Sequence, residues 1–301
     1  MTGLGLCCAL GSDPGEVSRA IAAGRSAVGL AGDYRDRLGV GFAMVDVDVR
    51  PLLKRRKDRK LLPRSAHMAL PAAFQAMGDD RPEQGAVYLG VGREPPEDAT
   101  EATILASHRA GGLDVEALGT IGLTLYPPLA SLRTLPNMVL AHIAIQLDLT
   151  GPCGTLAGDS ASGLTSVVRA AHAVAEGRAE VALAGGADSL VHPLRARDAV
   201  RRGWSEPLGE GAAVLRLESV DRARARGAHI YCVLGDRRSG VREPGTCDLL
   251  HHRAVGRCGA ADGAIALLLA ISTKNEGRLH VHDETGAFAA LCWGPSPEAI
   301  L

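Results

Sequence analysis

Residues 149–190 read LTGPCGTLAGDSASGLTSVVRAAHAVAEGRAEVALAGGADSL. Apolar periodicity in this stretch predicts a strand at 155–157, a tight turn at 158–160 and a helix at 161–176. A second strand is predicted at 181–184. Ser160 therefore lies where a strand passes into a helix, beside free backbone N–H groups and the positive end of the helix dipole. Such a position suits a nucleophile and an acyl oxygen that develops negative charge.

The same stretch resembles the nucleophile segment of the β-ketoacyl synthases, the condensing enzymes of fatty-acid and polyketide synthesis. Four groups of residues match the family pattern in register: Gly151-Pro152, Ser160, 161–164 and 183–186. The family's nucleophile is a cysteine, and this chain has Ser160 at that position. A helix N-terminus can lower the pKa of a thiol but cannot activate an alkanol in the same way, so the serine needs a neighbouring base.

Further family motifs follow one another in family order through residues 1–228. They are an opening strand at 2–6, a helix expected over 126–147 with the sequence LPNM at 135–138, and a strand at 209–218. The resemblance implies an α/β fold, a thiolase-like five-layer αβαβα sandwich built from two similar halves. We expect residues 1–228 to form the N-terminal ketosynthase-like half and residues 229–301 a shortened C-terminal half.

The shortened half keeps only part of the family pattern. We expect a strand, a helix and a closing hairpin, at 229–235, 259–272 and 279–293. The resemblance places Arg257 at the family's second catalytic histidine and His252 at its lysine. The His-Gly-Thr-Gly-Thr motif that carries the first histidine is missing. Condensation by the family's ordinary mechanism should therefore fail.

One interpretation is a partner subunit, as the chain-length factor is in type II polyketide systems. Such a subunit would pair with an active ketosynthase, or with a second copy of itself, through the strand at 181–186. The basic run Lys54–Lys60 would contact an acyl carrier protein, although such a run is also typical of a solvated surface segment.

A second interpretation is a serine acyltransferase or hydrolase that acts on carrier-protein thioesters. Ser160 would be the nucleophile and His252 the general base, with His251 as the reserve and Asp262 or Asp159 to orient the imidazole. The segment 158–162 nearly matches the GxSxG motif. For either interpretation we expect Asp159, Ala161 and Phe288 to contact substrate, with Phe288 at the end of the reduced loop that lines the family's site.

A third interpretation is a scaffold or relic that binds no acyl chain. No metal site is expected, because His251 and His252 are adjacent and the sequence shows no third ligand. No cofactor is expected either, since Gly3 and Gly5 do not complete a GxGxxG motif.

Composition narrows the remaining possibilities. The net charge of −1 gives no field for nucleic acid, and no apolar run of 18 residues predicts a membrane span. The seven cysteines are scattered without a CxxC pair, which favours reduced thiols in the cytoplasm.

Overall fold

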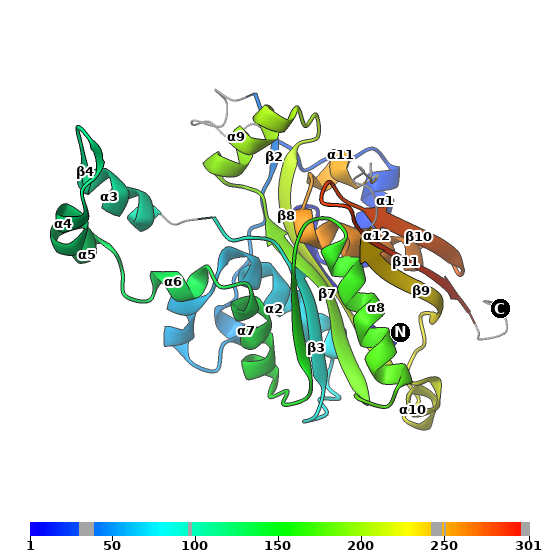
Figure 1. Ribbon diagram of the computed structural model, residues 1–301. Coiled ribbons are helices and arrows are strands. Elements are labelled where there is room, and N and C mark those ends of the chain that lie inside the picture. Colours follow the sequence, from blue (N-terminus) through cyan, green and yellow to red (C-terminus); the bar gives the residue numbers. More distant parts are fainter. Residues whose placement is uncertain (30–38, 96–97, 242–248, 250, 296–301) are drawn as a thin grey trace.

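The computed structural model describes residues 1–29, 39–95, 98–241, 249 and 251–295. Its main elements form layers (Figure 1): an outer pair of helices, a large sheet, a central pair of helices and a small sheet. The outer helices are α2 (Arg64–Met77) and α7 (Asn137–Leu147), and the central helices are α8 (Ser162–Ala175) and α12 (Asp262–Ile271). This alternation of helices and sheets is the α/β arrangement that the sequence predicts.

The strands of the large sheet lie in the order β1 (Gly3–Cys8), β8 (Leu208–Glu218), β7 (Val181–Ser189), β3 (Ala86–Val91) and β6 (Cys153–Ala157), and β2 (Phe42–Ala43) pairs with β8. β7 pairs antiparallel with β8 and parallel with β3, and all of its residues are buried. A strand with two neighbours has no free edge, so the expectation that 181–186 pairs with another subunit is wrong. Among the described residues, the open edge at this end of the sheet belongs to β6.

The core is built from small aliphatic side chains, because only 3% of the residues are aromatic. Leu164 and Val167 of α8 are fully buried against the large sheet. Glycine allows the helix and the sheet to lie close together: a Cβ on Gly90 of β3 would be 2.4 Å from the backbone nitrogen of Gly163. This close approach places the N-terminal end of α8 at the carboxyl ends of β3 and β6.

The strands of the small sheet lie in the order β9 (Val233–Val241), β11 (Ala287–Gly294) and β10 (Gly277–His282). This order and its antiparallel pairing repeat β1, β8 and β7 of the large sheet, and α12 precedes β10 as α8 precedes β7. Counterparts of β3 and β6 are missing from the described part of the small sheet. Arg238, Arg278 and His280 are exposed on its outward face, so the described residues provide four of the five expected layers.

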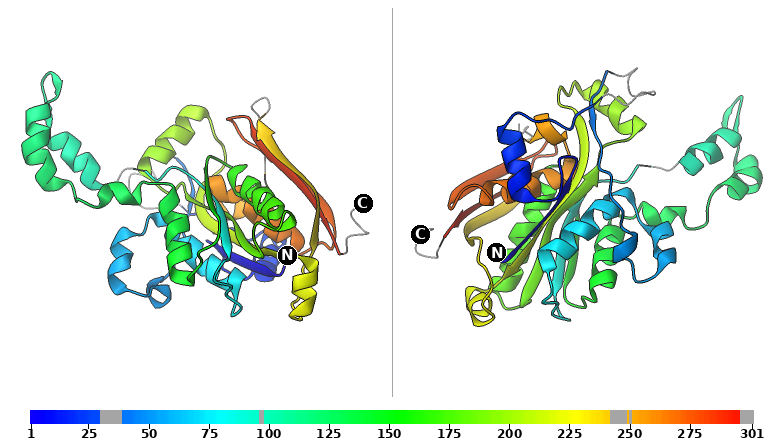
Figure 2. Two further views of the ribbon diagram at one scale, coloured as in Figure 1. Left: turned by 60° about the horizontal axis from the view of Figure 1, so that its bottom comes forward. Right: turned by 180° about the vertical axis from the view of Figure 1, so that it is seen from behind.

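Shorter elements surround these layers: α1 (Pro14–Ala22), which packs against α12, η2 (Arg50–Leu52), η3 (Arg56–Leu61), α9 (Pro193–Arg202), α10 (Val220–Ala225), α11 (His252–Val255) and η5 (Gly259–Ala261). A further group forms an arm that projects from the body of the molecule (Figures 1 and 2): α3 (Asp98–Ala106), β4 (His108–Arg109), β5 (Gly112–Leu113), α4 (Val115–Ala117), η4 (Leu118–Gly122) and α5 (Leu123–Leu125), with α6 (Ala130–Arg133) leading back.

Some boundaries differ from the sequence prediction, and the strand expected at 181–184 extends to Ser189. The single helix expected over 126–147 is instead α6 and α7, because Pro127, Pro128 and Pro136 supply no backbone N–H for a continuous helix. The strand expected at 229–235 begins only at Val233. The division of the chain at residue 228 stays a prediction.

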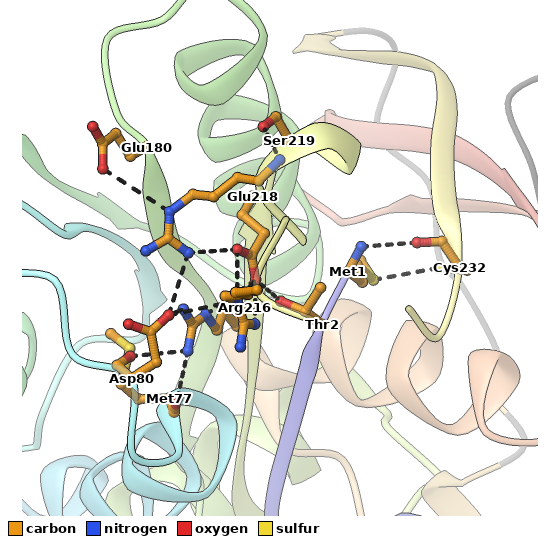
Figure 3. A network of polar contacts seen from close by, with 11 residues as sticks. Met1, Thr2, Met77, Asp80, Glu180, Arg216, Glu218, Ser219 and Cys232 are labelled. Atoms are coloured by element: carbon orange, nitrogen blue, oxygen red, sulfur yellow. Dashed lines mark hydrogen bonds and ion pairs between the residues drawn. The ribbon is translucent and has the colours of Figure 1, made fainter. Parts of the chain in front are cut away.

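A network of polar contacts joins β8 to the end of α2 and to the chain start (Figure 3). The buried guanidinium of Arg216 donates to the carbonyl oxygens of Met77 and Asp80, at 2.7 and 2.9 Å. The neighbouring Glu218 accepts hydrogen bonds from Arg222 at 2.6 Å and from Arg226 at 3.0 Å. Each arginine and each carboxylate of this network has a partner of opposite sign, and the Met1 ammonium donates to the carbonyl oxygen of Cys232.

Candidate functional site

Ser160 lies in the turn between β6 and α8 and is only 3% exposed. The N–H of Ser162 donates to the carbonyl oxygen of Asp159 at 2.8 Å and closes the turn. The N–H of Gly263 donates to the carbonyl oxygen of Ser160 at 3.1 Å and joins this turn to the start of α12. The predicted position of Ser160, buried where a strand meets a helix, is confirmed.

Asp262, the first residue of α12, is the centre of the site. Its Oδ2 accepts a hydrogen bond from the Ser160 hydroxyl at 3.0 Å. Its Oδ1 accepts from the Cys258 N–H at 2.8 Å and lies 3.2 Å from Nε2 of His251. Burial alone would raise the pKa of Asp262, but the adjacent charge of His252 and the hydrogen bond with His251 hold it well below its usual range.

His252 lies on the other side of the same carboxylate. Its Nε2 is 3.2 Å from Oδ2 of Asp262, yet neither ring nitrogen makes a hydrogen bond within the described residues. Nε2 is therefore close to the carboxylate without being well directed at it, and Nδ1 has no partner among the described residues. Burial lowers the pKa of His251, whereas the charge of Asp262 outweighs burial at His252 and raises its pKa. Together, His251, His252 and Asp262 form a group able to hold a metal ion.

The Ser160 hydroxyl is poorly placed for nucleophilic attack in this arrangement. Its hydrogen bonds go to carboxylates, Asp262 at 3.0 Å and Asp159 at 3.4 Å, and no described hydrogen bond joins it to a histidine. Two negative charges oppose the formation of an alkoxide. A carboxylate with a lowered pKa is also a weak proton acceptor, so Asp262 is a poor substitute for the missing imidazole.

Asp159 lies beside Ser160 at a separate small pocket. Its Oδ2 is 3.4 Å from the Arg257 guanidinium, which in turn lies 3.8 Å above the Trp204 ring. Burial raises the pKa of Asp159 despite this cation. The pocket, also lined by Arg195, has a volume of about 120 Å³, well below the range of roughly 300–1,000 Å³ usual for small-molecule sites. Trp204 could not be predicted as a site residue, because only the fold brings the segment that follows α9 to Arg257.

Ala161 and Phe288 do not join Ser160 in a substrate pocket. The Ala161 side chain is fully buried in the core that α8 shares with the small sheet. Phe288 pairs with His282 in β11, and its ring lies 5.8 Å from that of His280. Because Ala289 packs into the core, its neighbour Phe288 faces the opposite side of the sheet.

Comparison with known proteins identifies the family. Residues 1–223 match the model of the β-ketoacyl synthase N-terminal domain, so the chain belongs to the β-ketoacyl synthase family. A putative polyketide β-ketoacyl synthase 1 of Streptomyces cyaneus is 32% identical over 214 residues, which cover 62% of this chain and 48% of that protein. Nodulation protein E of Rhizobium sp. strain N33 is 28% identical over 260 residues, which cover 76% of this chain and 60% of that protein. The chain thus spans about half the length of these relatives.

Solved structures show the same thiolase-like ketosynthase fold. The ishigamide ketosynthase/chain length factor aligns with a TM-score of 0.79 at 19% identity, over 98% of each chain. A type II ketosynthase in the AntDE:AntF complex with its acyl carrier protein aligns with a TM-score of 0.78 at 17% identity, over 97% of this chain and 98% of that one. Among the described residues, no helix has the length and apolar character needed to cross a membrane.

Proposed function

We propose that this chain is a non-condensing ketosynthase-type subunit of a type II fatty-acid or polyketide system. It pairs with an active ketosynthase and acts with that enzyme on chains attached to an acyl carrier protein in the cytoplasm. The relatives named as polyketide β-ketoacyl synthases and the fold shared with a ketosynthase/chain length factor support this proposal. The observation that carries it is the apolar surface of the projecting arm.

The chemistry of the site supports the part of the proposal that the chain does not catalyse condensation. The hydroxyl of Ser160 stands where the family has a thiol, and it is held between two carboxylates. Arg257 occupies the position of a family histidine and is engaged by Asp159 and Trp204. A guanidinium stays protonated at all ordinary pH values, so Arg257 cannot exchange a proton as that histidine would.

The arm supports the pairing part. Large apolar side chains that elsewhere in a protein would be buried are exposed along it: Ile104, Leu105, Leu113, Val115, Ile121, Leu123, Leu125, Leu129 and Leu135. Val115 alone is 77% exposed. So many exposed apolar side chains on one projecting segment favour a protein–protein interface. Among the described residues, β6 is the last strand at one end of the large sheet, and its partly exposed outer edge is open to a partner strand.

A basic surface supports the carrier-protein part. Arg55, Arg56, Lys57, Arg59 and Lys60 are exposed around η3. An acidic partner such as an acyl carrier protein would be attracted to a cationic surface, and this segment supplies one. Lys54 is instead engaged by Asp148.

The arm can be tested by co-expressing the chain with an active ketosynthase from the same system. Val115→Asp with Leu123→Asp should abolish co-purification, because two charges would be buried at the interface. Val241→Asp is the matched control, since Val241 is 79% exposed but lies on β9, away from the arm. Loss of pairing in the arm variant with retention in the control supports the proposal. Pairing that survives the arm variant contradicts it.

A second candidate, a Ser160 acyltransferase or hydrolase, is favoured by the approach of Ser160 and His252 to the same oxygen of Asp262. It requires an acyl-enzyme on Ser160 that forms with acyl carrier protein thioesters and disappears in His252→Ala. Intact-mass spectrometry measures this directly. We expect no mass increase on the unaltered chain, and an acyl adduct lost in both Ser160→Ala and His252→Ala would establish the second candidate instead.

A further inference from the structure

The start of α12 and the start of α11 bring together three side chains that bind metals well. One ligand atom each of His251, His252 and Asp262 lies within 4.8 Å of the others, and the three side chains are buried. Asp262 supplies the third ligand that is not apparent from the two adjacent histidines in the sequence. Ser160 Oγ, 3.0 Å from Asp262 Oδ2, is a fourth potential ligand atom at the same place.

The ring of His252 is the second, independent observation. It is only 2% exposed, and its Nδ1 has no partner among the described residues, while its Nε2 makes no hydrogen bond and has only the Asp262 carboxylate at 3.2 Å. A buried polar atom without a partner costs roughly 1–3 kcal/mol, so native structures seldom keep one. A ligand that accepts the electron pair of one nitrogen would remove this penalty.

We propose that His251, His252 and Asp262 bind a divalent transition-metal ion, with zinc as the favoured metal. Two imidazoles and one carboxylate form a donor set that zinc accepts in four-coordinate sites, and Ser160 or a water would complete it. His251 also lines an apolar pocket of about 440 Å³, together with Leu249, Leu269 and Leu279.

Such an ion would change the surroundings of Ser160. Its positive charge would offset the carboxylates that flank the hydroxyl. It would also hold the short helix α11 against α12 through ligands on both elements. The proposal concerns metal binding alone, and it stands or falls independently of whether the chain pairs with a ketosynthase.

A surface pair of histidines must be removed before the buried site can be measured. His280 and His282 lie on the same face of β10, with ring centroids 5.6 Å apart. Side chains two residues apart on a strand point the same way, so this pair could also hold zinc. The reference protein for the experiment is therefore the full chain with His280→Asn and His282→Asn.

The reference protein is stripped with a chelator, incubated with Zn²⁺ or Co²⁺, dialysed, and examined by elemental analysis and visible absorption. We expect about one metal ion per chain and a tetrahedral Co²⁺ spectrum. His252→Ala and the near-isosteric Asp262→Asn should each lower metal content at least tenfold, with circular dichroism confirming that both variants fold. His142→Ala is the matched control, since His142 is buried on α7 and outside the cluster.

Retention of metal in His142→Ala, with loss in the two site variants, supports the proposal. A reference protein that binds less than about a tenth of an equivalent overturns it. Undiminished binding in folded His252→Ala would also overturn it, because the ion would then lie elsewhere.

Discussion

The Oγ of Ser160 lies 3.0 Å from Asp262 and 3.4 Å from Asp159, so the hydroxyl has carboxylates on two sides. A serine hydrolase places an imidazole at that position and the carboxylate behind it. Here the carboxylate of Asp262 lies against both the serine and His252. The residues of a catalytic triad are present, but their order in space is different. This order favours a structural role for Ser160.

Another buried carboxylate, Glu218, stabilises the fold in a pH-dependent way. Burial would raise its pKa, but hydrogen bonds from Arg226, Thr2 and Arg222 lower it from 4.5 to about 2. A lowered folded-state pKa stabilises the protein above the unfolded value, and this stabilisation is lost as pH falls through the folded value. At 1.36 kcal/mol per pKa unit, the contribution at pH 7 is at most about 3 kcal/mol.

We expect Glu218→Gln to lower the free energy of unfolding by up to about 3 kcal/mol at pH 7. The difference from the unaltered chain should shrink between pH 5 and pH 2 and vanish below pH 2, where both side chains are neutral. Urea denaturation at several pH values measures this. A difference that stays constant across the range would show that Glu218 acts through packing and not through its charge.

At the scale of elements, the contact of α8 with the large sheet depends on glycine. A Cβ on Gly90 would lie 2.4 Å from the backbone of Gly163, and backbone atoms cannot move aside as a flexible side chain can. We expect Gly90→Ala to cost at least about 1–3 kcal/mol, the range for overpacked cores, as measured by chemical denaturation.

Gly119→Ala is the control, because a Cβ there meets no atom within 4 Å. It should leave the free energy of unfolding within about 1 kcal/mol of the unaltered chain. Equal effects of the two substitutions would mean that the close packing of α8 on β3 does not limit stability.

The elements around Ser160 could be predicted from the sequence because their signals are local. The turn at 158–160 and the periodicity of Leu164 and Val167 need no knowledge of the rest of the chain. The partners of each strand could not be predicted in this way. The apolar run at 181–184 would suit a strand at the edge of a sheet as well as a strand in its middle. Only its pairing with both β3 and β8 shows that it is an interior strand of the large sheet.

The same limit applies to the site. Ser160, Asp262, His251 and His252 could be named as candidates from motif positions. Their geometry could not, because it depends on how α11 and α12 meet the turn before α8. Phe288 illustrates the difference: a one-residue alternation along β11 turns its side chain away from the core that Ala289 enters.

At the scale of the whole molecule, the two sheets are unequal copies of one pattern. β9, β11 and β10 repeat β1, β8 and β7, and the described part of the small sheet stops there. The large sheet, whose half carries Ser160 and the arm, has the strands β1, β8, β7, β3 and β6. The described part of the half that would complete a condensing site has only β9, β11 and β10. We therefore propose that the chain keeps what pairing with a ketosynthase requires and lacks what condensation requires.

The most direct test of this account is product output in a reconstituted system of this chain, its active ketosynthase and an acyl carrier protein. The account predicts that Ser160→Ala leaves the amount of product unchanged, since Ser160 takes no part in acyl transfer. It also predicts that the arm variant Val115→Asp/Leu123→Asp abolishes output. A Ser160→Ala chain that folds and pairs normally but gives no product would contradict the account.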